Sequence, residues 1–343
     1  GNINLMESNK FSAIFTDLKN PYLGEVEKRD LKTGEILVKV LACPVHPIDR
    51  MVAEGGFMFP GIKSQLPFGV GFDGAGTVEE AFDEENKSMI GLTVGFIQNP
   101  LSPTYEGTYR EYIYTRVEEV FPFPQGTDPE TVFSVSNPIT VKNIVEVAEH
   151  GKHKAIVHSA ACSSIGKMMI KYCKKIDLPL INIVRRDEQV DTLKNIGAEY
   201  VLNSESESFS QDLKNLSKEL GATAFFDPIC GSLTWKILKE LPSPSTAYIF
   251  DNMSEEKFDF EPNDLIFNQK SISYVNILAW IPSKSAEEMK SMIGEICEDL
   301  LKDGEIFGTS VYKTYPLKDF EQAFKDSITY ASKGKILLKP HPE

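Results

Sequence analysis

The sequence has few cysteines, a deficit of basic charge and no long apolar run. Its five cysteines are scattered and odd in number, which argues against a disulfide framework and for a reducing compartment with free thiols. The 36 Lys and Arg residues are outnumbered by 50 Asp and Glu residues, and the formal net charge of −14 argues against a nonspecific nucleic-acid binder. No stretch approaches the ~18 consecutive apolar residues of a membrane span. We therefore expect a soluble intracellular protein, of the cytoplasm or the mitochondrial matrix, that binds neither nucleic acid nor a membrane.

The length of 343 residues exceeds the usual size of one hydrophobic core and predicts two domains. The chain changes character near residue 135. Before this point, short β-rich runs alternate with turn residues, among them "GEILVKVLAC" (34–43), which has a period-two pattern, and "LTVGFIQ" (92–98). Many short strands without helices between them indicate a barrel-like β domain.

After residue 135, apolar runs alternate with helical patterns. Five such units follow one another, from the strand "KAIV" (154–157) to the strand "STAYIF" (245–250). The apolar runs are continuous, as in strands that are buried on both faces, so the pattern predicts a parallel, doubly wound sheet. The last run, "GKILLKP" (334–340), returns to a β pattern, and we expect it to rejoin the first domain.

The turn "HSAACSSIGKMM" (158–169) has one glycine where a dinucleotide-binding turn ordinarily has three. The three positions hold Ala161, Ser163 and Gly166, so only the glycine that lets the helix pack closely on the strand is kept. Ala161 is small enough for the turn if its φ stays negative. Ser163 and Ser164 can offer hydroxyl and N–H groups to a phosphate at the helix start. A serine N-cap on an ordinary α/β sheet would explain the same residues.

The second strand of this region ends in "VRRDE" (184–188). An NAD-preferring site places an acidic residue here for the ribose 2′-hydroxyl. Arg185 and Arg186 instead suit a 2′-phosphate, because guanidinium groups pair bidentately with phosphate oxygens. Asp187 comes later, and we expect it to begin a helix. Two solvated loop arginines are the alternative, but the strand, turn and helix that precede them favour NADP(H).

Eight stretches of the chain follow one another in an informative order. They are "ACPVHPID" (42–49), "LPFGVGFDGAGTV" (66–78), "EGTYREY" (106–112), "SNPITV" (136–141), "SAACSSIGKM" (159–168), "INIVRRDEQVDTLKNIGAEYVLNS" (181–204), "LIFNQKSISY" (265–274) and "GKILLKP" (334–340). In this order they resemble the zinc-independent branch of the medium-chain dehydrogenase/reductase superfamily, within it the group of 2-enoyl thioester reductases and quinone oxidoreductases. The similarity extends over nearly the whole chain.

The resemblance implies a fold and a cofactor. A GroES-like β-barrel substrate domain would comprise residues 1–134 and 310–343, and a Rossmann dinucleotide-binding domain would comprise residues 135–309. It implies an active cleft at their junction and a homodimer joined through Rossmann edge strands. The cofactor would be NADP(H). The residues that the resemblance places on it are Thr140, Ser163, Ser164, Ile165, Arg185, Arg186, Asn203, Asp227, Pro228 and Phe250.

Three residues are the candidates for catalysis. The asparagine of the group's NPxD motif is replaced by His46, which could donate a proton near neutral pH beside the nicotinamide ribose, or could simply bond nearby backbone. The thioester reductases have a tyrosine, the supposed proton donor or substrate-positioning group, where this chain has Phe57. Tyr105 belongs to a loop expected at the rim of the cleft, with packing as the alternative. The histidines expected to have surface or structural roles are His150, His153 and His158.

A catalytic zinc needs three protein ligands. The zinc-dependent relatives have a glycine-histidine-glutamate motif where this chain has Gly71-Phe72-Asp73. Cys43 and His46 have ligand spacing but no partner cluster. We therefore expect no metal site.

The resemblance predicts an NADPH-dependent oxidoreductase that reduces conjugated carbonyl compounds (enones, enoyl thioesters) or quinones by hydride transfer without a metal. The protein would supply orientation, a dry cleft and hydrogen bonds to the developing oxyanion of a small-molecule substrate. The alternative is a catalytically reduced or inactive NADPH-binding member that acts as an assembly or structural subunit. Phe57 and the serine-substituted turn favour the alternative, whereas Arg185 and Thr140 favour the enzyme.

Overall fold

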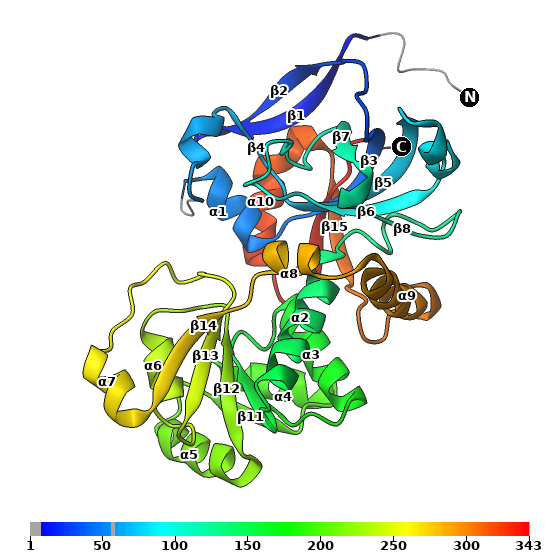
Figure 1. The fold of residues 1–343 in the computed structure, drawn as a ribbon. Coiled ribbons are helices and arrows are strands. Elements are labelled where there is room, and N and C mark those ends of the chain that lie inside the picture. The colour runs from blue at the N-terminus through cyan, green and yellow to red at the C-terminus, as the bar shows by residue number, and fades with distance from the viewer. Residues whose placement is uncertain (1–7, 56–58, 343) are drawn as a thin grey trace. The chain divides into compact units, whose positions relative to one another are not determined.

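The computed structural model describes residues 8–55 and 59–342, and the chain divides by its internal contacts into two compact units (Figure 1). Among these residues, unit 1 has two sheets and unit 2 has one, and each unit has its own hydrophobic core. No helix among the described residues is both long and apolar enough to cross a membrane. Unit 1 comprises residues 1–136, 291–304 and 308–343, and unit 2 comprises residues 137–290 and 305–307.

Unit 1 consists mainly of short strands. Its strands are β1 (Lys10–Thr16), β2 (Pro21–Glu27), β3 (Glu35–Pro44), β4 (Phe68–Gly69), β5 (Asp73–Ala81), β6 (Thr93–Ile97), β7 (Tyr112–Arg116), β8 (Val120–Pro122), β15 (Val311–Tyr315) and β16 (Lys335–Leu338). Its helices are α1 (Pro47–Ala53), α10 (Phe320–Thr329), the end of α9 (Ala286–Lys302), and the 3-10 helices η1 (Ile62–Gln65), η2 (Glu84–Met89), η3 (Val117–Glu119) and η4 (Leu317–Asp319).

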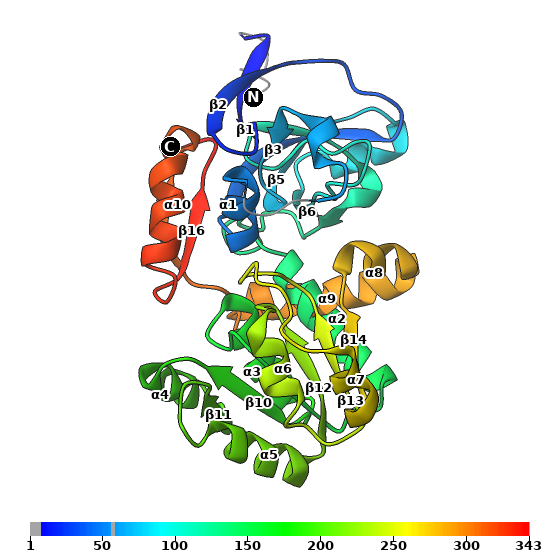
Figure 2. The ribbon, with the colours of Figure 1, turned by 90° about the vertical axis from the view of Figure 1, so that its left-hand side faces the viewer.

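Two sheets organise these strands. The larger has the order β15-β16-β3-β5-β6-β8, with β7 also paired to β3, and the smaller has the order β2-β1-β4. All pairs are antiparallel except β15 with β16. The C-terminal strand β16 pairs with β3, and α10 lies along β16 (Figure 2). The short strands predicted before residue 135 are thereby confirmed.

Strand β3 is buried on both faces, although its sequence alternates. Ile36 and Val38 have no exposed surface and belong to the main core of the unit. Leu37, on the opposite face, is also buried, because it packs in a second cluster with Phe11 and Tyr114. The smaller sheet therefore covers the face that a simple period-two pattern would leave in water.

Unit 2 contains six parallel strands. The five predicted strands are confirmed, and the sixth, β14, was missed because its sequence "KSISY" has one apolar residue and lies at the sheet edge. The strands are β9 (Ala155–His158), β10 (Leu180–Val184), β11 (Tyr200–Asn203), β12 (Ala222–Asp227), β13 (Ser245–Ile249) and β14 (Lys270–Tyr274). The helices are α2 (Ser136–His150), α3 (Ser164–Lys175), α4 (Asp187–Asn195), α5 (Phe209–Leu220), α6 (Ser232–Leu238), α7 (Pro262–Asn268), α8 (Ile277–Ser283) and the start of α9.

The strand order β11-β10-β9-β12-β13-β14 is that of a doubly wound sheet. The first strand in sequence, β9, lies beside the fourth, β12, so the direction of winding reverses between them. Ligands of such sheets bind at the carboxyl ends of the strands at this point. The loops that follow β9 and its neighbours are therefore the place to look for a cofactor site.

Candidate functional site

The turn between β9 and α3 is tight and ends in a capped helix start. Its left-handed residue is Ala160, with a φ of 50°, so Ala161 keeps the negative φ that the sequence requires of it. Ser163 is the N-cap residue of α3, and its Oγ accepts a hydrogen bond from Gly166 N at 3.1 Å. The serine cap is therefore present. Because Ser163 is exposed and its oxygen is here an acceptor, the hydroxyl proton can still be donated to a ligand.

Gly166 lies where α3 packs against this turn. A Cβ atom at this position would lie 2.3 Å from the carbonyl oxygen of Ala161, a backbone atom that cannot rotate away. The predicted packing role of Gly166 is therefore confirmed. The close approach brings the start of α3, with the N–H groups of Ser164 and Ile165, directly against the turn. The first N–H groups of a helix have no partners within it and favour a bound anion.

Two exposed arginines follow β10 directly. Arg186 is the N-cap residue of α4, and its Nε lies 3.6 Å from Glu188 Oε1 in an exposed ion pair. The backbone N–H of Arg185 donates to Gln189 Oε1 at 3.2 Å, while its guanidinium makes no ion pair with any residue that the structure describes. Asp187 begins α4, as predicted. Both guanidinium groups are therefore accessible to a phosphate.

Asn203 ends β11 and is held against the start of α4. Its Nδ2 donates to Asp187 Oδ1 at 2.9 Å, and its Oδ1 accepts from Glu205 N at 2.9 Å. These bonds use both ends of the side-chain amide. Asn203 thus fixes the end of β11 close to the residues that follow Arg185 and Arg186.

Asp227 ends β12 and has no exposed surface. Its Oδ1 accepts hydrogen bonds from Ile229 N and Cys230 N, both at 2.9 Å. Ser159 Oγ donates to Oδ1 at 3.3 Å, and Thr234 Oγ1 donates to Oδ2 at 2.6 Å. The carboxylate therefore ties the ends of β9 and β12 to α6 and shapes the loop after β12.

The remaining predicted cofactor residues lie in two places. Pro228 is buried directly after β12, and Phe250 follows β13, where its N–H donates to Asp227 O at 3.1 Å. Thr140 is buried in α2. All the predicted cofactor residues except Thr140 thus lie at the carboxyl ends of β9 to β13. Exposed guanidinium groups, serine hydroxyls and a helix N-terminus along one sheet edge are the donors that the phosphates of NADP(H) require, so these residues fit that cofactor.

Unit 1 contains a buried polar cluster around Asp73, the first residue of β5. His46 Nε2 lies 3.0 Å from Asp73 Oδ2, so the imidazole contacts a carboxylate and not the backbone alone. Ser134 Oγ donates to the same oxygen at 2.9 Å, and Ser136 Oγ donates to it as well. An ionised carboxylate can only accept, so in this contact the matching form of His46 is the one with a proton on Nε2.

Asp49 fixes the backbone on which His46 lies. Its Oδ2 accepts from His46 N at 2.8 Å, and its Oδ1 accepts from Phe72 N at 3.2 Å. Asp49 has no exposed surface, and burial raises the pKa of its carboxyl group. The start of α1 is therefore tied to the segment immediately before Asp73, which holds the two side chains opposite each other.

Sequence reasoning selected His46 but missed Asp73, Ser134 and Ser136 as its partners. One signal was present. In "VGFDGAG" (70–76) an acidic residue stands inside an apolar, glycine-rich segment. A buried carboxylate needs hydrogen-bond donors, so such a residue indicates a polar cluster. The identity of the donors was not available, because they come from residues more than 60 positions away.

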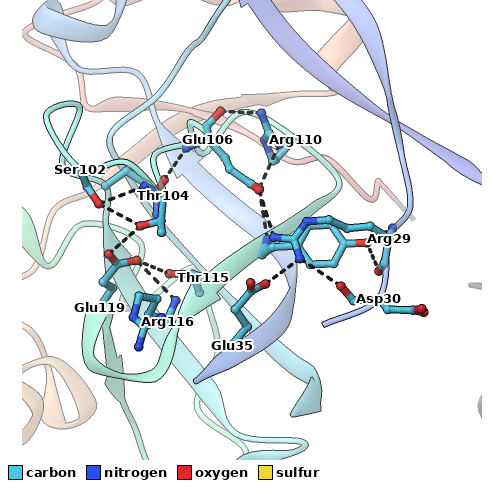
Figure 3. Close-up of polar contacts among 12 residues, drawn as sticks. Arg29, Asp30, Glu35, Ser102, Thr104, Glu106, Arg110, Thr115, Arg116 and Glu119 are labelled. Carbon is cyan, nitrogen blue, oxygen red and sulfur yellow. Dashed lines mark hydrogen bonds and ion pairs between the residues drawn. The ribbon is translucent and has the colours of Figure 1, made fainter. Parts of the chain in front are cut away.

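The loop that contains Tyr105 is held on both sides by charged residues (Figure 3). Thr104 Oγ1 donates to Glu119 Oε1 at 3.2 Å, and Glu106 Oε2 accepts from Arg110 Nη1 at 3.2 Å. The Tyr105 hydroxyl donates to Gly69 O at 2.6 Å, and burial raises its pKa well above the ordinary value. Tyr105 thus packs and fixes this loop. Phe57 lies outside the described residues.

The residues near His46 do not fit a catalytic zinc ion. Cys43 Sγ donates to Thr108 O at 3.3 Å, and burial raises the pKa of this thiol well above its ordinary value, so the thiolate that zinc binds is disfavoured. His46 and Asp73 are already paired with each other. No three His, Cys, Asp or Glu side chains among residues 8–55 and 59–342 are grouped so that they could hold a metal ion.

Comparison with known families gives two matches in the order of the chain. Residues 32–125 match the alcohol dehydrogenase GroES-like domain, and residues 164–295 match the zinc-binding dehydrogenase family. The first lies in unit 1, and nearly all of the second lies in unit 2. The predicted architecture, a GroES-like domain with a Rossmann-type domain, is confirmed.

Individual relatives agree with these matches. The chain is 25% identical to the mitochondrial enoyl-[acyl-carrier-protein] reductase of Rattus norvegicus, over 91% of this chain and 81% of the relative. A Bacillus thuringiensis structure named as an NADPH:quinone reductase superposes with a TM-score of 0.83 at 21% identity, covering 97% of this chain and 100% of the other. The Etr1p complex with NADP and crotonyl-CoA superposes with a TM-score of 0.74 at 17% identity, covering 96% and 99%.

Proposed function

This chain belongs to the medium-chain dehydrogenase/reductase superfamily, and from that premise we propose that it is an NADPH-dependent reductase of conjugated carbonyl compounds or quinones that uses no metal. The observation that supports this most strongly is the pair of exposed arginines, Arg185 and Arg186, at the end of β10 on the same sheet edge as the serine turn. The similarity to enoyl-[acyl-carrier-protein] reductases and to a structure named as an NADPH:quinone reductase supports the substrate class.

The cofactor-binding residues have separate tasks in this proposal. Arg185 and Arg186 hold the 2′-phosphate by charge-assisted hydrogen bonds. The hydroxyl of Ser163 and the N–H groups of Ser164 and Ile165 hold the pyrophosphate at the start of α3. Among the other predicted residues, Asn203, Asp227 and Pro228 shape the adjoining loops, Phe250 follows β13, and Thr140 lies in α2.

NADPH, when bound, supplies a hydride to the substrate. Reduction of a conjugated carbonyl compound then leaves negative charge on the substrate, which must be stabilised and protonated. His46 is the proton source in this proposal, because an imidazolium ring can donate a proton and this ring is held in a defined orientation by Asp73. The buried Cys43 thiol and the paired His46 and Asp73 side chains do not suit a zinc ion, so in this proposal polar side chains and backbone N–H groups stabilise the developing oxyanion.

The test is a titration with NADPH followed by turnover assays on an enone, a benzoquinone and crotonyl-CoA. We expect binding of NADPH and turnover of at least one acceptor. Dialysis against EDTA should leave the rate unchanged, whereas one equivalent of zinc per chain would contradict the metal-free proposal. Binding of NADPH without turnover of any acceptor would instead favour a non-catalytic subunit.

We also propose a homodimer joined through the edge of the parallel sheet and a reducing intracellular compartment. Strand β14 is one of the two edge strands of this sheet, and Tyr274 at its end is 70% exposed. In α7, Phe267 is 78% exposed and Ile266 is 65% exposed, which is unusual for large apolar side chains on a monomer. All five cysteines are free. Sedimentation at micromolar concentration, compared between the wild type and Phe267→Glu, tests the dimer.

A further inference from the structure

Three hydrogen-bond donors converge on one oxygen of Asp73. Oδ2 accepts from His46 Nε2, Ser134 Oγ and Ser136 Oγ, whereas Oδ1 is buried and has no hydrogen-bond partner among the described residues. A buried carboxylate whose polar contacts all involve one oxygen is not explained by fold stability alone, since the second oxygen gains nothing. This arrangement points to a task for Oδ2.

The exposed fractions of the His46 and Asp73 side chains indicate how Oδ2 of Asp73 could contribute to chemistry. The His46 side chain keeps 11% of its surface exposed, but the Asp73 side chain keeps only 1%. Asp73 therefore cannot touch a substrate, whereas the imidazole can. Any effect of Asp73 on chemistry must act through His46.

We propose that Asp73 is the positioning residue of His46: its Oδ2, oriented by Ser134 and Ser136, holds the Nε2 proton and stabilises the imidazolium, from which the Nδ1 proton passes to the reduced substrate and leaves the neutral Nε2–H ring. The kinetic part of this inference rests on the proposed function, but the protonation state of His46 does not. In proteins generally, a carboxylate that accepts a hydrogen bond from one ring nitrogen of a histidine sets the tautomer and favours the protonated ring.

Ser134 and Ser136 hold the Asp73 carboxylate in one orientation, with Oδ2 facing the His46 ring. Ser134 Oγ also lies 3.4 Å from His46 Nε2, so it contacts both members of the pair. Each hydroxyl has one proton to donate, and each donates it to Oδ2. The Asp73 carboxylate is thereby prevented from rotating away from the imidazole.

Three other titratable groups adjoin this pair. Asp49 bonds the backbone of His46 and is a second negative group, with its pKa raised by burial. Cys43, at the end of β3, is a neutral thiol because burial raises its pKa. Burial lowers the pKa of Lys335, in β16, to about 8, while Asp49 and Asp73 oppose that shift. None of these three side chains forms a hydrogen bond with the ring of His46 among the described residues, whereas Asp73 bonds the ring directly.

The direct test uses 15N-histidine NMR on the full chain. In the wild type, neutral His46 should be the Nε2–H tautomer, and Asp73→Asn should shift the ring toward its neutral form at a given pH, because an opposite charge favours the protonated form. Asp326→Asn is the matched control, since Asp326 is a buried carboxylate of unit 1 that bonds Tyr315 and Gln322. An Nδ1–H tautomer in the wild type, which needs no variant to detect, would overturn the proposal.

The kinetic test separates positioning from folding. Asp73→Asn should lower kcat with an unchanged KM for NADPH, and the falling limb of the kcat profile should move to lower pH. The variant Ser134→Ala should produce a smaller shift in the same direction, and it provides a second readout if Asp73→Asn fails to fold. An unchanged pH profile in folded variants of an active enzyme would refute the inference and leave the proposed function standing. A wild type without turnover would remove the proposed function, and the NMR result would still decide the inference.

Discussion

Each unit of the molecule buries a histidine, and the two histidines have different partners. His46 in unit 1 bonds the carboxylate of Asp73 and keeps part of its ring surface exposed. His158 in unit 2 bonds the amide oxygen of Asn182 at 2.5 Å and is almost fully buried. Burial lowers the pKa of His158 to about 4. The two histidines thus differ in partner and exposure: His46 faces a carboxylate and reaches the surface, whereas burial keeps His158 neutral.

The surroundings of His158 show that its role is structural. Asn182 Nδ2 donates to Tyr200 O at 2.9 Å, so the amide oxygen is the atom that faces His158. The His158 ring therefore links β9 to β10, and the Asn182 amide extends the link to β11. The difference suggests two expectations: the polar cluster around Asp73 in unit 1 should affect kcat, whereas the turn, the arginines and His158 of unit 2 should affect cofactor affinity or stability.

The largest effect is expected for His46→Asn. Loss of a general acid ordinarily lowers the rate by ~10²–10⁴-fold, so kcat on an enone should fall by about this factor and lose its decline at high pH. The Kd for NADPH should not change, because the residues proposed to bind its phosphates belong to unit 2. The measurement is the kcat profile between pH 5 and 9. His150→Asn, a change at an exposed histidine of α2, is the control. A normal profile in His46→Asn would break the comparison.

The second effect concerns the packing of the turn in unit 2. Gly166→Ala places a Cβ atom 2.3 Å from a backbone oxygen, and overpacking of this kind costs roughly 1–3 kcal/mol of unfolding free energy. The Kd for NADPH should rise at least ~10-fold, because the start of α3 must move.

Gly294→Ala is the matched control for this variant. It also lies inside a helix, but an added Cβ would meet no atom within 4 Å, so the change should be neutral or stabilise by roughly 0.5–1 kcal/mol. Urea denaturation measures both variants. Equal stabilities of the two would show that α3 does not need close contact with the turn.

The third effect is the pH dependence that His158 adds to stability. The pKa of His158 in the folded chain is about 4, below the ordinary value of 6.5. Between these two pH values the unfolded chain therefore binds a proton on this histidine and the folded chain does not. Stability is therefore present above pH 6.5 and is lost as the pH falls toward 4, by roughly 2 kcal/mol between pH 7 and pH 5. In His158→Gln this part of the slope should disappear from urea denaturation curves. An identical slope in both proteins would contradict the contrast with His46.

How far the sequence predicts this molecule differs between the units for a physical reason. In unit 2 the signals are local: a buried strand, a turn and a helix follow one another, and Arg185 and Gly166 are where the pattern predicts. Strand β14 was missed because an edge strand needs little apolar surface. Its pairing with β13 depends on backbone hydrogen bonds that any sequence can make.

In unit 1 the decisive contacts are long-range. The bond between His46 and Asp73 joins residues 27 positions apart, and that between Ser134 and Asp73 joins residues 61 positions apart. No periodicity marks such pairs, because they depend on how β5 and the segment before α2 come together. For the same reason the sequence left open whether Tyr105 acts on a ligand or packs, and the structure gives its hydroxyl a backbone partner, Gly69 O.

The smallest effect is expected for the arginines of unit 2. The wild type should bind NADPH at least ~10-fold more tightly than NADH, a difference of about 1.4 kcal/mol, and Arg185→Ala combined with Arg186→Ala should abolish it without changing the Kd for NADH. Arg185→Ala alone should have the larger single effect, because Arg186 is partly engaged by Glu188. The preference should also weaken with added salt, since both guanidinium groups are exposed.

Lys194→Ala, at an exposed cation of α4, is the control and should retain the preference for NADPH. Equal affinity of the wild type for both nucleotides would show that these arginines bind no 2′-phosphate, and unit 2 would then lose its assigned part in the comparison.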